Sequence, residues 1–467
     1  MKLGELKDKS VLILGLGREG IDSFKFLRKL FPKKILGIAD KNEKVDQSCL
    51  AKLSNQKNKL YKLYLGKNYL KALKDYDVII KSPGVPIHLP EIEKAFKEGK
   101  ITSQAEIFFD NWPPEPQRRV EMKANSEGGK LHRPGKIIGI TGTKGKGTTS
   151  SLIYRILKEG GFKAYLVGNI EKPVLSTLFK AKANDIFVYE LSSHQLYNLK
   201  KGPQIAVFLN LFAAHLDYYK NFKEYQRAKE NITLHQTKKD YFIYNSEQKE
   251  LRGFLKKTKA KKIPIPTNYE YLTNIRIPLI GKFNLKNVMA AVAVGELFNI
   301  PKKKIREAIK SFKPLSHRLE FVGKYKGIEF YNDSLATVPE ATIAAIDALS
   351  RNVQTIILGG FNSNVDYKKL AKRVLESGIK TVILFPPSGQ KMWENICQKS
   401  KGRKLPEHSF VNNMKDAVKL AYQYTKRGKI CLLSCASPSY GIFKNYKERG
   451  NLFKRYAKKY GKRLSSS

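Results

Sequence analysis

One stretch of the sequence decides the fold: Lys136-Ile-Ile-Gly-Ile-Thr-Gly-Thr-Lys-Gly-Lys-Gly-Thr-Thr149. Its apolar start predicts a strand, and residues 152–157 continue as a helical pattern that stops at Gly160-Gly161. Glycines between a strand and a helix let backbone N–H groups approach phosphate oxygens, and a lysine there reaches the outer phosphates. The stretch therefore predicts a P-loop nucleotide site, with an ordinary ligand-free turn as the alternative. The expected phosphate contacts are Gly142, Thr143, Lys144, Gly145, Lys146, Gly147, Thr148 and Thr149.

A second glycine turn, Gly15-Leu-Gly-Arg-Glu-Gly20, lies between an apolar strand pattern and an amphipathic helical pattern. The strand pattern that follows the helix ends at Asp40. This arrangement is typical of a βαβ unit that binds a nucleotide pyrophosphate at the helix N-terminus, with the acidic residue near a ribose or base. A glycine turn without a ligand is the alternative here too.

Two polar residues follow apolar strand patterns of the same region. Glu190 ends the pattern of residues 184–190, and His215 follows the pattern of residues 205–210. Because ligands of open α/β sheets gather at the carboxyl ends of strands, this pair beside a P-loop suits Mg²⁺ and its phosphates. Lys229 lies in a helical pattern, and its spacing alone predicts a solvated surface charge.

Alternating strand and helix patterns predict three α/β domains with mostly parallel sheets. The expected division is a Rossmann-like domain at residues 1–112, a linker at 113–133, a P-loop domain at 134–312 and a second Rossmann-like domain at 313–467. Residues 113–133 are predicted to be a linker because they are rich in Pro, Gly and charge.

Composition narrows the class of protein. Lysine and arginine number 88 against 41 acidic residues, so the formal net charge is +47, while 42% of residues are apolar. A chain this apolar is not predicted to be disordered, and its charge suggests a polyanionic partner. Four cysteines without CxxC spacing, no apolar run long enough for a membrane span and no signal-peptide pattern favour a reduced, cytoplasmic protein.

Six ordered motifs resemble those of the Mur ligases, at residues 141–148, 190–195, 209–217, 281–287, 317–320 and 332–334. The turn at residues 15–20, the segment 81–84 and the segments 434–437 and 443–450 resemble the branch that adds D-glutamate to UDP-N-acetylmuramoyl-L-alanine. The resemblance covers the chain apart from residues 113–133. It implies an ATP-dependent amide ligase of peptidoglycan precursor synthesis. The reaction would pass through an acyl phosphate, with domains closing around UDP-N-acetylmuramoyl-L-alanine, glutamate and ATP.

The resemblance also implies roles for individual residues. Lys146 would hold the β- and γ-phosphates, Glu190 and Thr148 would bind one Mg²⁺, and His215 would bind a second Mg²⁺ with Lys229, carbamylated by CO₂. The remaining ATP contacts would be Asn284, Asn287, Arg318 and Asp333. The UDP-sugar contacts would be Gly15, Leu16, Gly17, Arg18, Asp40, Ser82, Asn169 and Gln195. The amino-acid contacts would be Thr337, Ser437 and Tyr446. We expect a monomer without a specific nucleic-acid partner.

Several alternatives stay open. Leu335 stands where the D-glutamate branch usually carries lysine, and no lysine follows Gly359-Gly360 closely, so a variant that adds L-glutamate is possible. The Gly-Lys-Gly-Thr loop resembles that of the folylpolyglutamate synthases, a second alternative. A nucleic-acid-binding P-loop ATPase, favoured by the charge, is the alternative from another class.

Overall fold

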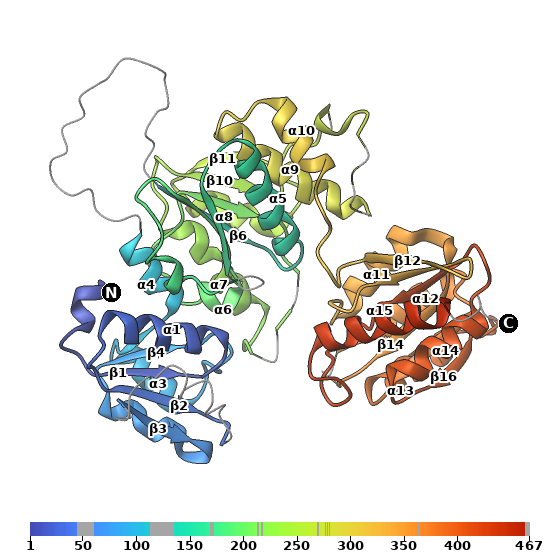
Figure 1. Ribbon diagram of the computed structural model, residues 1–467, viewed down its shortest axis with the longest axis horizontal. Helices are drawn as coiled ribbons and strands as arrows, with labels where there is room; N and C mark the ends of the chain where they lie inside the picture. The colour runs from blue at the N-terminus through green and yellow to red at the C-terminus, as the bar shows by residue number, and fades with distance from the viewer. Residues whose placement is uncertain are drawn as a thin grey trace. The chain divides into compact units, whose positions relative to one another are not determined.

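The computed structural model describes residues 1–43, 60–112, 135–168, 172–212, 214–215, 218–268, 270–275, 277, 279, 281–362 and 365–462. These residues form three α/β domains, as the sequence predicts, each with its own sheet (Figure 1). Two compact units contain them. Residues 1–275 and 286–310 make the first unit, and residues 276–285 and 311–467 make the second, so the division falls within one helix, α9 (Lys282–Leu297). The predicted linker, 113–133, lies outside the described residues.

The first sheet has the order β3-β2-β1-β4-β5, with every neighbouring pair parallel. Strands β1 and β4 are buried along their whole length, which agrees with the apolar sequences of β1 and of residues 78–80 in β4. The strand order reverses direction at β1, so the ends of β1 and β4 form the crevice where a ligand is expected. Its elements are β1 (Val11–Leu14), α1 (Arg18–Leu30), β2 (Leu36–Asp40), β3 (Tyr61–Leu65), η2 (Gly66–Asp75), β4 (Val78–Lys81), α3 (Pro90–Lys97), β5 (Ile101–Thr102) and α4 (Gln104–Asn111).

The second sheet has the order β11-β10-β9-β6-β8-β7 and is also parallel throughout. Strand β6 lies between β8 and β9, and the register pairs Ile140 with Glu190 and Thr141 with Phe208. The loop after β6 therefore lies beside the ends of both neighbours. Its strands are β6 (Lys136–Thr141), β7 (Ala164–Gly168), β8 (Ile186–Glu190), β9 (Ile205–Phe208), β10 (Tyr241–Tyr244) and β11 (Lys261–Pro264). Its helices are α5 (Lys146–Glu159), α6 (Ser193–Leu196), α7 (Phe222–Leu234), α8 (Arg252–Lys257), α9 (Lys282–Leu297) and α10 (Lys302–Lys310), with η3 at Leu175–Thr177.

The third sheet, in the second unit, has the order β12-β13-β17-β14-β15-β16. Only β12 and β13 pair antiparallel among the described strands; the other pairs are parallel. Its strands are β12 (Glu320–Tyr325), β13 (Ile328–Asn332), β14 (Val353–Gly359), β15 (Thr381–Phe385), β16 (Glu407–Phe410) and β17 (Ile430–Leu433). Its helices are α11 (Pro339–Leu349), α12 (Lys368–Glu376), α13 (Ser388–Lys399), α14 (Met414–Tyr424) and α15 (Tyr446–Lys462).

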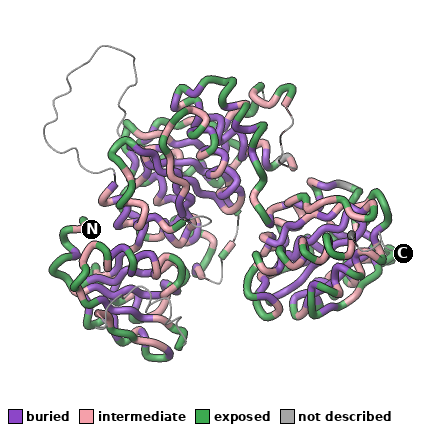
Figure 2. The backbone as a smooth tube through the Cα atoms, in the orientation of Figure 1, coloured by how far each residue is buried: buried purple, intermediate pink, exposed green. Residues whose placement is uncertain are grey.

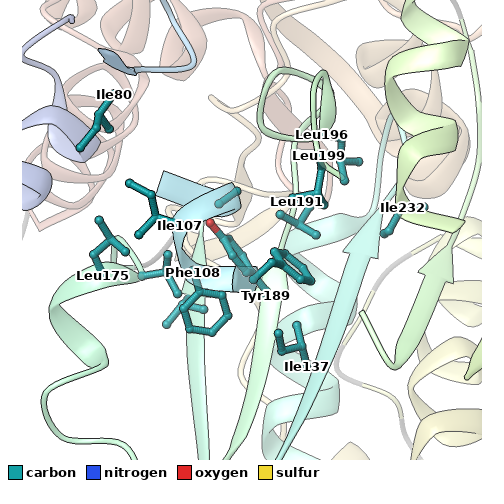
Figure 3. Close-up of a cluster of buried hydrophobic side chains, with 14 of the residues drawn as sticks. Ile80, Ile107, Phe108, Ile137, Leu175, Tyr189, Leu191, Leu196, Leu199 and Ile232 are labelled. Atoms are coloured by element: carbon teal, nitrogen blue, oxygen red, sulfur yellow. The ribbon is translucent and has the colours of Figure 1, made fainter. Parts of the chain in front are cut away.

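One hydrophobic cluster joins the first two domains. Ile80 and Phe108 of the first domain belong to the same buried cluster as Tyr189, Leu191 and Leu196 of the second (Figure 3). The Phe108 ring lies 4.8 Å from that of Phe187 and 5.7 Å from that of Tyr189. The third domain has two clusters of its own. Figure 2 shows that buried stretches of the chain run through the interior of each domain, with exposed stretches on the outside. Among the described helices, none combines the length and the apolar composition that crossing a membrane requires.

Candidate active site

The predicted P-loop joins β6 to α5 and is held in place from two sides. Gly145, at the N-cap of α5, has φ +86°, and a Cβ there would overlap Asn287 Oδ1, so both conformation and space require glycine. On the other side, Asn210 Oδ1 accepts a 2.8 Å hydrogen bond from Lys144 N, and Asn210 Nδ2 donates to Lys144 O. The Thr143 and Tyr225 hydroxyls lie 2.9 Å apart. Sequence reasoning gave Asn210 and Tyr225 no role.

Polar groups converge on the start of α5. Lys146 Nζ donates to Gly142 O at 2.8 Å and to Thr143 O at 3.2 Å, so its ammonium lies over the loop. The hydroxyl oxygens of Thr148 and Thr149 are buried and have no hydrogen-bond partner within the described chain. Buried hydroxyls without partners are costly, and a phosphate or hydrated cation would satisfy them. Glu190, 3% exposed, ends the strand next to β6.

Lys229 is buried, although its place in a helical pattern predicts a position on the surface. The side chain is 1% exposed, and its Nζ lies 3.2 Å from Thr141 Oγ1 and 3.1 Å from Gly142 O at the base of the loop. The prediction of a solvated surface charge is therefore wrong. Burial, with Lys146 nearby, holds the pKa of Lys229 well below its usual value, although Glu190 opposes this shift.

His215 lies in an aromatic group between the second sheet and the first domain. Its backbone has φ +58°, an unusual value for a non-glycine residue, and its ring lies 4.9 Å from that of His194. The His194 ring packs 4.2 Å from that of Tyr218. Burial, with the charge of His215, lowers the pKa of His194 to about 3, so His194 is neutral at ordinary pH.

The N-terminal glycine turn has the geometry of a ligand-binding loop. Gly15 has φ +87°, and a Cβ at Gly20 would overlap Gly15 O, so the fold itself requires both glycines. A Cβ at Gly17 would meet no described atom within 4 Å, so Gly17 leaves open space in front of the turn. Asp40 Oδ2 accepts from Leu16 N at 2.6 Å, and Ser82 Oγ donates to Gly15 O at 2.6 Å. Among the other predicted contacts, Arg18 opens α1, and Asn169 lies outside the described residues.

Polar side chains connect this turn to the second domain. Gln195 Nε2 donates to Glu19 Oε1 at 2.6 Å, and Lys81 Nζ donates to the Tyr218 hydroxyl at 3.1 Å. Burial dominates both ionisable groups: it raises the pKa of Glu19 to about 7 and lowers that of Lys81 to about 8. Glu19 lies in the turn at residues 15–20 and Lys81 in the segment 81–84. The burial of these two side chains where the first two domains meet cannot be predicted from a single sequence.

In the second unit, predicted contacts collect at the carboxyl ends of β13 and β17. Asp333 Oδ1 accepts from Leu319 N at 3.1 Å, and Asp333 Oδ2 accepts from Ser434 Oγ at 2.8 Å. Ser437 is fully buried, and its hydroxyl donates to Phe361 O. Tyr446 O accepts from Ser334 Oγ at 2.8 Å. Thr337 and Arg318 are half-buried, and Asn284, on the part of α9 in this unit, is buried.

The donor set fits a magnesium ion held jointly with phosphates. Hard Mg²⁺ prefers oxygen ligands and commonly takes only one or two protein groups beside nucleotide phosphates. Glu190 and Thr148 can supply such oxygens at the P-loop. The described residues include no group of three or more His, Cys, Asp or Glu side chains arranged for a metal, so a site made only of such groups is not observed among them.

Comparison with known proteins places the chain in a family. Family models match three segments: the Mur ligase MurD-like N-terminal domain at residues 9–102, the Mur ligase middle domain at 140–274 and the Mur ligase glutamate ligase domain at 317–437. The UDP-N-acetylmuramoylalanine--D-glutamate ligase of Acetivibrio thermocellus is 32% identical over 477 residues, and that of Clostridium acetobutylicum is 33% identical over 475. Both alignments cover 96% of this chain and 96% of the relative.

Solved structures share the fold at lower identity. UDP-N-acetylmuramate-alanine ligase MurC from Thermotoga maritima matches with a TM-score of 0.58 at 17% identity, covering 97% of this chain and 99% of its own. MurF from Acinetobacter baumannii matches with a TM-score of 0.60 at 14% identity, covering 96% and 93%. With relatives above 30% identity along nearly its whole length, the chain belongs to the Mur ligase family.

Proposed function

We propose that this chain is an ATP-dependent ligase that joins D-glutamate to UDP-N-acetylmuramoyl-L-alanine in peptidoglycan precursor synthesis. The observation that carries the proposal is Lys229, a fully buried amine at the base of a P-loop. It is supported by relatives that match 96% of this chain and are named UDP-N-acetylmuramoylalanine--D-glutamate ligase. No ordinary surface role explains a lysine in this position, whereas a ligase that gathers phosphates and metal ions there does.

On the ATP side, the P-loop supplies positive charge and N–H donors. Lys146 and the loop amides would bind the β- and γ-phosphates, and Thr148 and Glu190 would hold one Mg²⁺. His215 and Lys229 would serve a second Mg²⁺. Bound magnesium would neutralise phosphate charge during transfer. Asn284, Asn287, Arg318 and Asp333 would complete the ATP contacts.

Lys229 would act as a carbamate. Burial disfavours the charged form of this amine and so favours the neutral form, which can attack the carbon of CO₂. The nitrogen forms a C–N bond, one C–O π bond of CO₂ opens and the nitrogen loses a proton, so a neutral amine becomes a two-oxygen anion. Such an oxygen donor suits a hard divalent cation, whereas an ammonium repels it.

On the sugar side, the open space at Gly17 would admit the diphosphate of the UDP-sugar. Leu16, Arg18, Asp40 and Ser82 would contact the uridine diphosphate, while Asn169 and Gln195 would approach the sugar. Gln195 lies on α6, which follows the strand ending at Glu190, so the sugar and ATP contacts belong to one continuous segment.

The chemistry follows from substrate activation. A carboxylate oxygen of the alanyl group attacks the γ-phosphorus, the bond to ADP breaks and an acyl phosphate forms. The glutamate ammonium loses a proton, and its nitrogen attacks the acyl carbon. The bond to phosphate then breaks, giving amide and inorganic phosphate, and the nitrogen releases a second proton. The protein's part is positioning and charge neutralisation, with Thr337, Ser437 and Tyr446 near the amino acid.

An ADP-release assay tests this function. The protein receives ATP, Mg²⁺ and UDP-N-acetylmuramoyl-L-alanine, with D-glutamate, L-glutamate and other amino acids offered separately. We expect turnover with D-glutamate alone. Turnover with L-glutamate instead would establish the variant specificity suggested by Leu335. No turnover with any amino acid, while a control ligase works in parallel, would refute the assignment.

The same assay distinguishes the proposed activity from that of a folylpolyglutamate synthase. A folylpolyglutamate synthase-like enzyme would accept a folate in place of the UDP-sugar, so folate with L-glutamate is a further arm. The match of residues 9–102 to a MurD-like N-terminal domain supports the UDP-sugar. We also propose that the protein works as a monomer, which light scattering during gel filtration would test.

A further inference from the structure

Arg449 is the largest fully buried side chain in the described part of the molecule. It lies in the first turn of α15, and its guanidinium donates three hydrogen bonds. Nε donates to Ser334 Oγ at 3.0 Å, Nη2 to Ser334 O at 2.8 Å and Nη1 to Ser437 O at 3.1 Å. One buried cation thus ties the loop after β13 to the loop after β17.

The charge of Arg449 has no close partner. No carboxylate of the described residues lies within 4.0 Å of its guanidinium, and its three acceptors are two carbonyls and a hydroxyl. A buried charge without a counter-ion is expensive unless hydrogen bonds or an anionic ligand compensate it. Among the described residues of the second unit, it is also the one lysine or arginine that is buried. An anion arriving nearby would therefore gain from this charge.

The position of Arg449 is the edge of the sheet where a ligand is expected. Strand β17 lies between β13 and β14, and the ends of these three strands carry Ser334, Ser437 and Gly360. A Cβ at Gly360 would come within 3.2 Å of Arg449 Nη1. Ser334 Oγ, which accepts from Arg449, itself donates to Tyr446 O. The guanidinium is therefore the centre of the network that shapes this edge.

We propose that Arg449 is a positioning residue of the amino-acid site: it fixes the loops after β13 and β17 and supplies the positive charge that attracts the carboxylates of the incoming amino acid. The inference rests on the proposed function, which places Thr337, Ser437 and Tyr446 at this site. Arg449 acts through Ser334 and Ser437 and through its field, because its own donors already bind those residues.

Steady-state kinetics test the inference with Arg449→Gln, Arg449→Lys and Arg455→Gln, in which Arg455 is an exposed arginine of the same helix. We expect Arg449→Gln to raise the KM for glutamate at least about tenfold while the KM values for ATP and the UDP-sugar stay within about twofold. Arg449→Lys keeps the charge and should recover part of the loss. Arg455→Gln removes the same charge from the surface and should match the wild type.

The results that would overturn the role of Arg449 differ from those that would contradict the proposed ligase activity. Wild-type turnover with glutamate is measured first, and its absence contradicts the proposed function itself. Given that turnover, an unchanged glutamate KM in Arg449→Gln, or equal increases in all three KM values, overturns the role of Arg449. If Arg449→Gln does not fold, Ser334→Ala, which removes one acceptor of the guanidinium, decides. We expect it to raise the glutamate KM about threefold, and a wild-type KM overturns the proposal.

Discussion

Three lysine or arginine side chains are buried in the described part of the chain, and each lies at or contacts the chain at the carboxyl end of a parallel strand. Lys81 ends β4, Lys229 contacts Gly142 after β6, and Arg449 contacts Ser437 after β17. Burying a charge away from water is costly, so a fold gains nothing from it unless an anion compensates. All three proposed substrates are anions. The three buried basic side chains therefore lie at the edges where the substrates are proposed to bind.

Replacing Lys229 tests the metal site most directly. Lys229→Ala should abolish ADP release because the proposed carbamate oxygens would be lost, and short carboxylic acids should restore part of the activity by supplying an oxygen donor. Isotopically labelled CO₂ provides a readout besides activity: the label should bind to the wild type and not to the variant.

The matched control for that experiment is Lys223→Ala, which removes an exposed lysine from the same helix, α7. It should retain wild-type activity and labelling. Full activity of Lys229→Ala without added acid would remove Lys229 from the mechanism.

Substitutions at two glycines, one at each end of α5, can distinguish the effect of backbone strain from the effect of steric crowding. Gly145 and Gly161 have nearly equal φ values of +86° and +85°, but only at Gly145 would a Cβ collide with another side chain, Asn287. We expect Gly145→Ala to abolish ATP binding, measured by calorimetry. Gly161→Ala should lower the melting temperature and leave ATP affinity unchanged. Equal ATP affinity in the two variants would show that the close contact with Asn287 has no importance.

Glu19 predicts a pH dependence of stability. Burial raises its pKa from 4.5 to about 7, so the folded state keeps a proton that the unfolded state releases between these values. Stability linked to Glu19 is therefore fully present below about 4.5 and is lost as pH rises through about 7. Glu19→Gln should gain melting temperature relative to the wild type as pH rises across this window. The exposed Glu91→Gln serves as control, and a constant difference at all pH values would contradict the prediction.

At the scale of elements, the sequence predicts the central strands better than the edges. Continuous apolar runs identify β14, β15 and β17 because both faces of these strands are buried. The edge strands β11 and β16 read Lys-Lys-Ile-Pro and Glu-His-Ser-Phe, and they escape such analysis because solvent-facing edges need few apolar residues. The antiparallel pair β12–β13 is missed for another reason: the half-buried side chains of β12 leave no apolar run.

The candidate site, like the fold, is predicted from the sequence only in part. Glycine turns and carboxylates at strand ends are local patterns, so Gly145 and Glu190 can be found from the sequence. Contacts between distant segments leave no local pattern. Arg449 meets Ser334 across 115 positions, and Lys81 meets Tyr218 across 137, which only the folded chain reveals.

Helix α7 carries Lys229, so its N-terminal cap should affect activity. Asn221 caps α7 by accepting from Glu224 N, and Asn413 caps α14 in the same way by accepting from Asp416 N. Either substitution by alanine should cost about 1 kcal/mol of stability, seen as a lower melting temperature. Only Asn221→Ala should also lower kcat, because α14 holds no proposed site residue. Equal kcat values for the two variants would contradict a link between the cap and Lys229.

At the scale of the whole molecule, the three domains differ in whether they share a hydrophobic core. The first two domains share one apolar cluster and belong to one compact unit, whereas the third has clusters of its own. A shared core resists relative motion, while separate cores permit it. The proposed UDP-sugar and P-loop contacts thus belong to one packed unit, and the proposed amino-acid contacts belong to the other.

The net charge of +47 is the remaining property of the whole molecule, and a salt titration of DNA binding tests what it means. A positive field would attract the anionic substrates, but the three buried lysine and arginine side chains account for little of the net charge. We expect weak binding to random duplex and single-stranded DNA at low salt through phosphate contacts alone. This binding should disappear near physiological salt, where exposed charges are screened beyond about 8 Å. Different sequences should give the same affinity and the same salt slope, and added DNA should leave ADP release unchanged. Tight, sequence-dependent binding that survives physiological salt would contradict this interpretation and would make nucleic acid a true partner of the chain.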